Sequence, residues 1–245
     1  MHPIICHIGP LTIYSYGVML AIAVIVCTYF LQKDARRLNL DAELIFDFVF
    51  WVVLSGIIGS RIFYVLLNLS EFRDTPLEIL MIHHGGLAWQ GGLIFGTVTG
   101  LIFLKRKNLP IAKTLDVSCP YAALGQSIGR IGCFLNGCCY GKPLAWGIYF
   151  PTHLAKLHPV QLYDSMGLLI VFSILKSYRR VSQKNGEVFI LYLVLASVER
   201  FFIEFFRGDH KAIFWGLTLF QVISLFIFMA AFYANTYLKS RSTAR

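Results

Sequence analysis

The stretch LGQSIGRIGCFLNGCCYGKPLAWGIY, residues 124–149, holds the most information about the fold of this chain. It begins as an apolar segment in which Gly125, Gly129 and Gly132 recur at spacings of four and three, as on one face of a helix. It then continues as a loop rich in glycine and cysteine. Arg130 lies inside the apolar part, where a charged side chain is costly and normally faces a protein interior or a water-filled cavity. The stretch therefore predicts a membrane helix that carries a functional arginine.

The composition is that of a membrane protein that crosses the bilayer several times. Of the 245 residues, 57% are hydrophobic and 14% are charged, whereas soluble domains carry about 25% charged residues. The apolar residues fall in runs of about 20, the length that crosses a hydrocarbon core of about 30 Å. We predict an all-α integral membrane protein with about seven transmembrane helices in one domain, residues 1–245. The approximate spans are residues 12–31, 45–67, 86–104, 111–135, 160–177, 187–206 and 217–238.

Charge predicts the orientation of these spans. The net charge of +9 would suit a nucleic-acid-binding protein, but most of the 22 Lys and Arg residues lie in the segments after the first, third, fifth and seventh spans. The positive-inside rule therefore places the N-terminus outside and the C-terminus in the cytoplasm, and we expect no nucleic-acid partner. No basic segment precedes the first span, so we expect no cleavable signal. Residues 136–158 are predicted to form a small head on the outer face with little regular structure.

Three arginines, Arg61, Arg130 and Arg200, lie within predicted spans. Any one of them could snorkel to the membrane surface or pair with an acid. Three together indicate an anion that enters the membrane plane, and a phospholipid phosphate fits because a guanidinium binds phosphate with two parallel hydrogen bonds. Arg200, Glu204 and Arg207 share one helical face. Glu204 therefore either only neutralises Arg200 or also orients it toward a substrate.

Polar and aromatic residues at the ends of the predicted spans are further candidates. Gln90 lies between the pairs Gly85-Gly86 and Gly91-Gly92, where its amide can offer a donor and an acceptor to a ligand. Such glycines also allow close helix packing without any ligand. Tyrosines at these positions are also common as interfacial anchors. The other candidates of this kind are Tyr14, Tyr16, His158, Gln161 and Tyr163.

Cys133, Cys138 and Cys139 form a C-x4-C-C pattern. This spacing is not a usual zinc pattern, and no second Cys or His cluster has a matching spacing. We therefore predict no metal and no cofactor, and small polar lining of a cavity is the default interpretation. A disulfide from Cys133 to Cys138 or Cys139 stays open as an alternative. The sequence contains no P-loop, no GxSxG and no HExxH motif.

Residues 129–141, GRIGCFLNGCCYG, resemble the signature of the prolipoprotein diacylglyceryl transferase family, Gly-Arg-x-Gly-Asn-Phe-x-Asn-x-Glu-x-x-Gly. YGVM, GSRIFYV, GGLAWQGGLIFG, HPVQLYDS and RFFIEFFRGD resemble further landmarks of that family, in the same order. The resemblance implies seven helices and an enzyme of lipoprotein biosynthesis in the bacterial inner membrane. Such enzymes move the diacylglyceryl group of phosphatidylglycerol from the bilayer to the lipobox cysteine of a prolipoprotein. They form a thioether and release glycerol phosphate.

The resemblance also implies roles for single residues. Arg130 and Arg200 would contact the phosphate and stabilise the charge of the leaving group, with Glu204 orienting Arg200. Three further residues match positions that are important in the family, namely Tyr16, Asn136 and Gly141. Candidate substrate-binding residues are Tyr16, Arg61, Arg130, Asn136, Gly141, His158, Gln161 and Tyr163, and candidate catalytic residues are Gln90, Arg130, Arg200 and Glu204.

The chain departs from the family at several of these positions. Gln90 replaces a histidine that is proposed as the base for the thiol, and Cys133, Cys138 and Ala196 replace an asparagine, a glutamate and a tyrosine. Three alternatives stay open: local positive charge activates the thiol, another histidine acts as the base, or the protein is an inefficient transferase. The substitute histidines would be His83, His84 or His158. The rival functions are a divergent relative that acts on another acceptor and a non-enzymatic membrane protein that binds anions or lipid.

Overall fold

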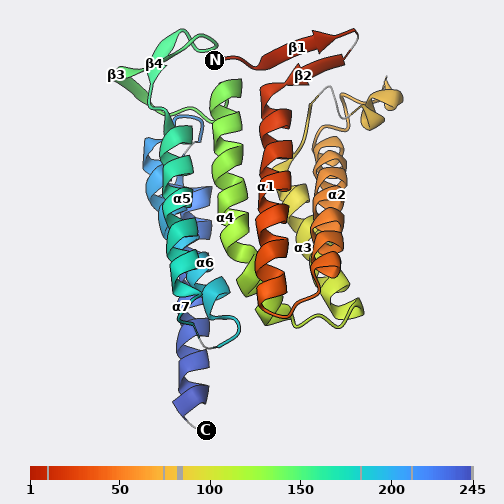
Figure 1. Ribbon diagram of the computed structural model, residues 1–245. Coiled ribbons are helices and arrows are strands. Elements are labelled where there is room, and N and C mark those ends of the chain that lie inside the picture. The colour runs from red at the N-terminus through yellow and green to blue at the C-terminus, as the bar shows by residue number, and fades with distance from the viewer. Residues whose placement is uncertain (10, 74, 82–84, 183, 211, 244–245) are drawn as a thin grey trace. The chain divides into compact units, whose positions relative to one another are not determined.

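The computed structural model describes residues 1–9, 11–73, 75–81, 85–182, 184–210 and 212–243, and helices dominate it (Figure 1). Each predicted span coincides with one α-helix, although several ends differ. In order, the α-helices are α1 (Ser15–Arg37), α2 (Ala42–Leu67), α3 (Trp89–Arg106), α4 (Ile111–Asn136), α5 (Val160–Tyr178), α6 (Glu187–Ile203) and α7 (Leu219–Thr243). The described residues also contain the 3-10 helices η1 (Pro76–Leu80) and η3 (Glu204–Phe206). By length and composition, α1, α2, α5 and residues Leu219–Thr236 of α7 can cross a membrane.

Carboxylates stabilise the starts of two helices. Asp41 precedes α2 and accepts hydrogen bonds from the backbone N–H groups of Glu43 and Leu44, at 2.9 and 3.2 Å. Asp116 on α4 accepts from the N–H groups of Gly186 and Phe189 at the start of α6, at 2.5 and 2.8 Å. A carboxylate at a helix N-terminus accepts hydrogen bonds from the free N–H groups there. Its negative charge also interacts favourably with the positive end of the helix dipole. Asp116 therefore also ties α6 to α4.

In the part of the chain that the structure describes, three antiparallel hairpins lie outside the helices. They are β1 (Ile4–Ile8) with β2 (Leu11–Tyr14), β3 (Pro143–Phe150) with β4 (Ala155–Leu157), and β5 (Ala212–Phe214) with β6 (Leu217–Thr218). Strand β2 occupies residues that the sequence assigned to the start of the first span. The β3–β4 hairpin shows that the prediction of little regular structure in residues 136–158 was wrong. Its register shifts between Pro143 and Ile148, and β4 has only three residues, so the pair gives a weak signal in sequence.

The chain forms two compact units, Met1–Phe30 with Leu115–Arg245 (the larger unit) and Leu31–Thr114 (the smaller unit). In the smaller unit, glycines bring α2 and α3 together. A Cβ atom on Gly91 would meet the backbone oxygen of Gly59 and lie 2.5 Å from the Cβ atom of Phe63. A Cβ atom on Gly92 would lie 2.5 Å from Ser60 Oγ. The pair Gly91-Gly92 thus serves close helix packing.

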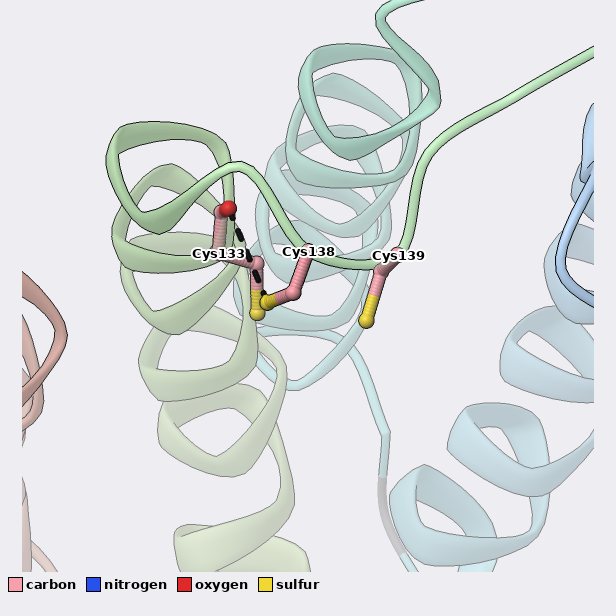
Figure 2. Close-up of side chains that lie close together, drawn as sticks. All are labelled: Cys133, Cys138 and Cys139. Carbon is pink, nitrogen blue, oxygen red and sulfur yellow. Dashed lines mark hydrogen bonds between the residues drawn. The ribbon is translucent and has the colours of Figure 1, made fainter. Parts of the chain in front are cut away.

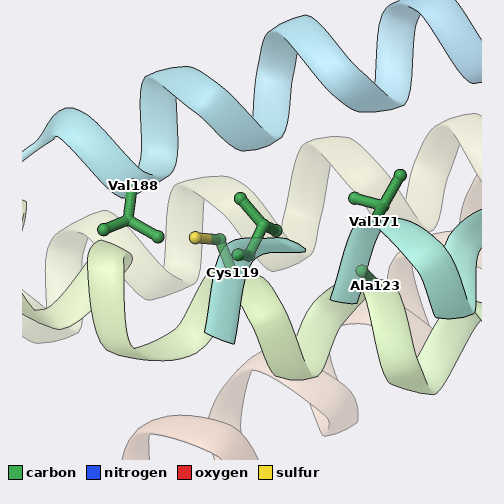
Figure 3. Close-up of a cluster of buried hydrophobic side chains, with 5 residues drawn as sticks. Cys119, Ala123, Val171 and Val188 are labelled. Atoms are coloured by element: carbon green, nitrogen blue, oxygen red, sulfur yellow. The ribbon is translucent and has the colours of Figure 1, made fainter. Parts of the chain in front are cut away.

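The core of the larger unit contains a cluster of small and branched side chains from α4, α5 and α6. Its members are Cys119, Ala123, Val171, Leu175 and Val188, and Figure 3 shows how these helices bring them together. Cys119 is 3% exposed and packs there as a small apolar side chain. Elsewhere, large apolar side chains such as Ile25, Phe226 and Phe232 are exposed along the helices. Such outward apolar surfaces are typical of helices that face lipid.

Candidate active site

A buried carboxylate lies between two arginines of the larger unit. Asp164, in the first part of α5, is 2.9 Å from Nε of Arg130 on α4 and 3.9 Å from Nη1 of Arg200 on α6. The Asp164 side chain is 3% exposed, whereas Arg130 and Arg200 are 26% and 21% exposed. Three helices therefore meet through one acid, while both guanidinium groups keep an accessible part. Both positive groups thus contact the same carboxylate.

Glu204 holds Arg200 from the other side. Its Oε2 atom lies 2.7 Å from Arg200 Nη2, and its side chain is fully buried. Thr218 donates a hydrogen bond to Oε1 at 2.9 Å, and His210 Nδ1 lies 2.5 Å from the same oxygen. The pair expected from the spacing of Arg200 and Glu204 is therefore present. Four contacts fix the position of this carboxylate, since Arg207 Nε also lies 4.0 Å from Oε2.

Arg207 has a different acid of its own. Its Nε and Nη2 atoms lie 2.9 and 2.5 Å from the two carboxylate oxygens of Asp209. Burial would lower the pKa of Arg207, but the hydrogen bonds and the charge of Asp209 outweigh it and raise this pKa. The sequence analysis did not single out Asp209 or His210, because both follow the predicted span in an ordinary polar loop. An acid two residues after Arg207 was the only signal available.

Three cysteine thiols come together where α4 ends. The Sγ atoms of Cys133, Cys138 and Cys139 all lie within 4.8 Å of one another. Figure 2 shows the three side chains close together where α4 leads into the loop. The helix ends with Gly137 at φ 80°, whose N–H donates to the backbone oxygen of Cys133 at 2.9 Å. Cys139 also has a positive φ, 59°, which is uncommon for a residue other than glycine. All six cysteines are free thiols, so the disulfide left open by the sequence is not formed.

Hydrogen bonds on two sides hold the loop that carries Cys138 and Cys139. Gln161, which is 1% exposed, donates from Nε2 to the backbone oxygen of Cys138 at 2.6 Å. The N–H of Gly141 donates to the backbone oxygen of His158 at 3.2 Å. On the other side, Gly208 N–H donates to the Tyr140 oxygen at 3.1 Å and Lys142 N–H to the Phe206 oxygen at 2.9 Å. Gln161, His158 and Gly141 therefore lie together, in contacts that fix this loop.

The remaining candidates of the larger unit are Tyr16, Asn136 and Tyr163. Tyr16 packs on α4, since a Cβ atom on Gly132 would lie 3.3 Å from its ring atom Cδ2. Asn136 is the last residue of α4, two residues before Cys138. The ring centroid of Tyr163 is 6.1 Å from that of His158 and 6.1 Å from that of Phe206. Hydrogen bonds from Cys133 and Cys138, with the positive charges of Arg207 and Arg130, lower the pKa of the Cys139 thiol.

Arg61 and Gln90 belong to the smaller unit. Arg61 is 7% exposed, and its guanidinium donates to the backbone oxygens of Ile79 at 3.0 Å, Gly85 at 2.6 Å, Gly86 at 3.1 Å and, by a short bond, Glu78. These contacts favour a structural role for Arg61 over the predicted substrate contact. Gln90 is exposed in the first turn of α3. His83 and His84, two of the proposed substitute bases, lie outside the described residues.

Comparisons with known proteins agree with the family resemblance of the motifs. The family described as prolipoprotein diacylglyceryl transferase matches residues 3–237. A phosphatidylglycerol–prolipoprotein diacylglyceryl transferase of Clostridium tetani is 35% identical over 234 residues, which cover 92% of this chain and 93% of that protein. A protein of the same name from Trichormus variabilis is 36% identical over 239 residues, 91% of this chain and 84% of its own length. This multi-pass membrane protein therefore belongs to the prolipoprotein diacylglyceryl transferase family.

Proposed function

We propose that this protein transfers the diacylglyceryl group of phosphatidylglycerol to the thiol of the lipobox cysteine of prolipoproteins. The observation that carries the proposal is the pair of partly exposed arginines, Arg130 and Arg200, anchored by the buried acids Asp164 and Glu204. The relatives named above carry this activity in their names. The residue positions on which the family resemblance rests include both arginines.

The geometry suits a phosphate diester. Asp164 holds Arg130, Asp164 and Glu204 hold Arg200, and each arginine keeps an accessible part of its guanidinium group. An arginine whose orientation is already fixed loses little freedom when it binds phosphate, and its planar fork can form two hydrogen bonds. Asp164 and Glu204 also offset the cost of placing two positive charges among apolar helices. Arg130 and Arg200 would thus bind the phosphate of phosphatidylglycerol.

The reaction follows from that placement. The acceptor thiolate attacks the glyceryl carbon that carries the phosphate, and a new S–C bond forms as the C–O bond breaks. The electron pair of the broken bond goes to the phosphate oxygen, and glycerol phosphate leaves. Positive groups aimed at the oxygen where negative charge develops lower the barrier. The thiol proton is released in forming the thiolate, and the product is the thioether of the lipoprotein.

We also propose how the chain crosses the membrane. All seven α-helices cross the bacterial inner membrane, with the N-terminus outside and the C-terminus in the cytoplasm, as the distribution of Lys and Arg supports. The β3–β4 hairpin and the cysteine loop then lie at the outer face. Labelling of single cysteines introduced at each end by a membrane-impermeant maleimide would test this. Labelling of the C-terminal end in intact cells would contradict it.

The activity is tested with labelled phosphatidylglycerol and a lipobox peptide, using protein purified in detergent. Wild-type protein should form the thioether and release labelled glycerol phosphate. Arg130→Ala and Arg200→Ala should each reduce the rate about 100-fold or more while the protein still inserts and folds. Arg130→Lys, which keeps the charge and loses the fork, should retain part of the activity. Transfer at the wild-type rate by either alanine variant would refute the proposal.

A second candidate keeps the chemistry and changes the acceptor. It is motivated by Cys133 and Cys138, which stand where the family signature has asparagine and glutamate. Mass spectrometry of membrane proteins from cells with and without the gene distinguishes the two. Loss of diacylglyceryl groups from lipobox cysteines supports the first proposal, and an unchanged set favours the other acceptor. The in vitro assay should also include Gln90→His, because glutamine cannot take up a proton at neutral pH.

A further inference from the structure

We propose that Cys133, Cys138 and Cys139 bind one zinc ion whose fourth ligand is the thiolate of the acceptor cysteine. The inference rests on the proposed function, because it assigns to the same site a means of converting the acceptor thiol into a nucleophile. It differs from our prediction from sequence, in which the C-x4-C-C spacing argued against a metal. The structure changes that judgement because the end of α4 brings the three sulfur atoms together.

The sulfur geometry fits zinc. Zn–S bonds are about 2.3 Å long, so sulfur ligands of a tetrahedral zinc ion lie about 3.8 Å apart. The three Sγ atoms already lie within 4.8 Å of one another, and small side-chain rotations would bring them to that spacing. Figure 2 shows the Cys138 side chain directed toward Cys133, with Cys139 on the same side of the loop. Three protein ligands leave one position open, as in catalytic zinc sites.

The backbone around the cluster is built to hold these side chains in place. The positive φ values of Gly137 and Cys139 turn the chain back toward the end of α4. The buried Gln161 side chain anchors the Cys138 carbonyl by a hydrogen bond of 2.6 Å. Hydrogen bonds that orient the ligand residues are characteristic of metal sites. A cavity lining of three unrelated thiols would not need this support.

The charges nearby suit a loaded site. Zinc with three thiolates carries one net negative charge, and a fourth thiolate adds a second. Arg130 and Arg207 both act electrostatically on Cys139, and Arg130 also acts on Cys133. These guanidinium groups would balance the excess negative charge of a zinc–thiolate centre. The same Arg130 contacts Asp164, so the metal centre would adjoin the proposed phosphate site.

Transfer of the diacylglyceryl group to a zinc-bound thiolate needs no reagent besides the two substrates and water. The acceptor thiol binds the open position and loses its proton to water, since a metal-bound thiol is deprotonated. Its sulfur then forms the S–C bond with the glyceryl carbon. The C–O bond breaks, and its electron pair goes to the phosphate oxygen beside Arg130 and Arg200. The thioether product has no negative charge on sulfur and is a weak zinc ligand, so it dissociates and reopens the position.

Metal content is the first test. Protein purified in detergent under reducing conditions should contain about one zinc ion per chain by inductively coupled plasma mass spectrometry. Cys139→Ser should lose most of this zinc. The matched control is Cys6→Ser, because Cys6 is exposed in β1 and lies outside the cluster; it should retain the metal. Wild-type protein with no zinc, or with Cys133 linked to Cys138 as a disulfide, would overturn the proposal.

A spectroscopic test on the wild-type chain does not depend on how well a variant folds. Co²⁺ in place of zinc should give the intense visible bands of tetrahedral cobalt with sulfur ligands. A lipobox peptide should shift these bands, whereas the same peptide with serine in place of cysteine should leave them unchanged. Identical spectra with the two peptides would show that the acceptor does not bind the metal and would overturn the proposal.

The transfer assay separates this proposal from the proposed function. Chelation of the metal should reduce the rate of thioether formation about tenfold or more, and added Zn²⁺ should restore it. Full activity of metal-free protein would overturn the zinc proposal and leave the transferase proposal intact. Protein that forms no thioether with or without zinc would refute the transferase proposal. The cobalt spectra with the two peptides would then still decide whether the site binds a thiol ligand.

Discussion

Arg61 and Arg130 are both arginines within apolar helices, but they have different kinds of partner. Arg61 is 7% exposed and donates to backbone carbonyl oxygens of residues 78, 79, 85 and 86. Arg130 contacts the carboxylate of Asp164 and is 26% exposed. Carbonyl oxygens in fixed positions satisfy a guanidinium group and lock a loop. A carboxylate on one side leaves the other side available to an anion. An arginine in a membrane helix therefore indicates function only once its partners are known.

Removing Arg61 is the most direct way to test the contrast. Arg61→Ala should lower the free energy of unfolding in detergent by about 3 kcal/mol, because the loop loses several hydrogen bonds to a charged group. Fluorescence-monitored thermal unfolding with and without the substitution measures this. Transfer per folded molecule should stay within about threefold of the wild type, since a structural loss acts mainly through the folded fraction.

The matched variant is Arg130→Ala, for which the opposite pattern is expected. It should abolish transfer while changing the unfolding temperature less than Arg61→Ala does, because Asp164 still has Arg200 nearby. The assignment of a structural role to Arg61 and a functional role to Arg130 would be wrong if the folded fraction of Arg61→Ala is as inactive as Arg130→Ala. In that case Arg61 would contact the substrate, as the sequence alone suggested.

The helices were predictable because each span is a long apolar run bounded by charges or glycines. The β3–β4 hairpin was not predicted, although the large apolar residues Leu144, Trp146, Ile148 and Phe150 recur at every second position. Its partner strand β4 has only three residues, and the register of the pair is irregular. The pair Arg200–Glu204 followed from helical spacing alone. Asp164, within the segment HPVQLYDS, proved to be the acid that joins Arg130 and Arg200.

The clustering of the cysteines could not be predicted from their spacing. Whether Cys133 meets Cys138 and Cys139 depends on how the chain leaves α4, and that is set by the φ values at Gly137 and Cys139. The partners of Arg61 were hidden for a similar reason. They are backbone oxygens that lie 17 to 25 residues further along the chain, and backbone acceptors leave no signature in the side-chain sequence.

Removing the charge of Glu204 tests whether this residue orients Arg200 or only neutralises it. Glu204→Gln keeps the shape and can still accept a hydrogen bond from Thr218, but it removes the charge beside Arg200. We expect about a 30-fold loss in kcat/KM, because a misplaced guanidinium group binds the phosphate poorly. A positioning role predicts a raised KM for phosphatidylglycerol together with a reduced kcat. An unchanged kcat/KM for the folded fraction would make Glu204 only a neutralising partner.

The smallest expected effect is a difference in stability between alanine at Gly141, in the loop of the stretch 124–149, and alanine at Gly129, in its helix. A Cβ atom on Gly141 would lie 2.5 Å from the Cβ atom of His158 and 2.7 Å from its backbone oxygen, whereas a Cβ atom on Gly129 would have nothing within 4 Å. Gly141→Ala should therefore lower the free energy of unfolding by about 1.5 kcal/mol, since the loop must shift. Gly129→Ala should leave it unchanged or raise it by up to about 1 kcal/mol, because alanine favours the helix. Thermal unfolding of the two variants side by side measures both effects. Equal destabilisation would mean that the close contact of the loop with His158 is not what requires glycine at position 141.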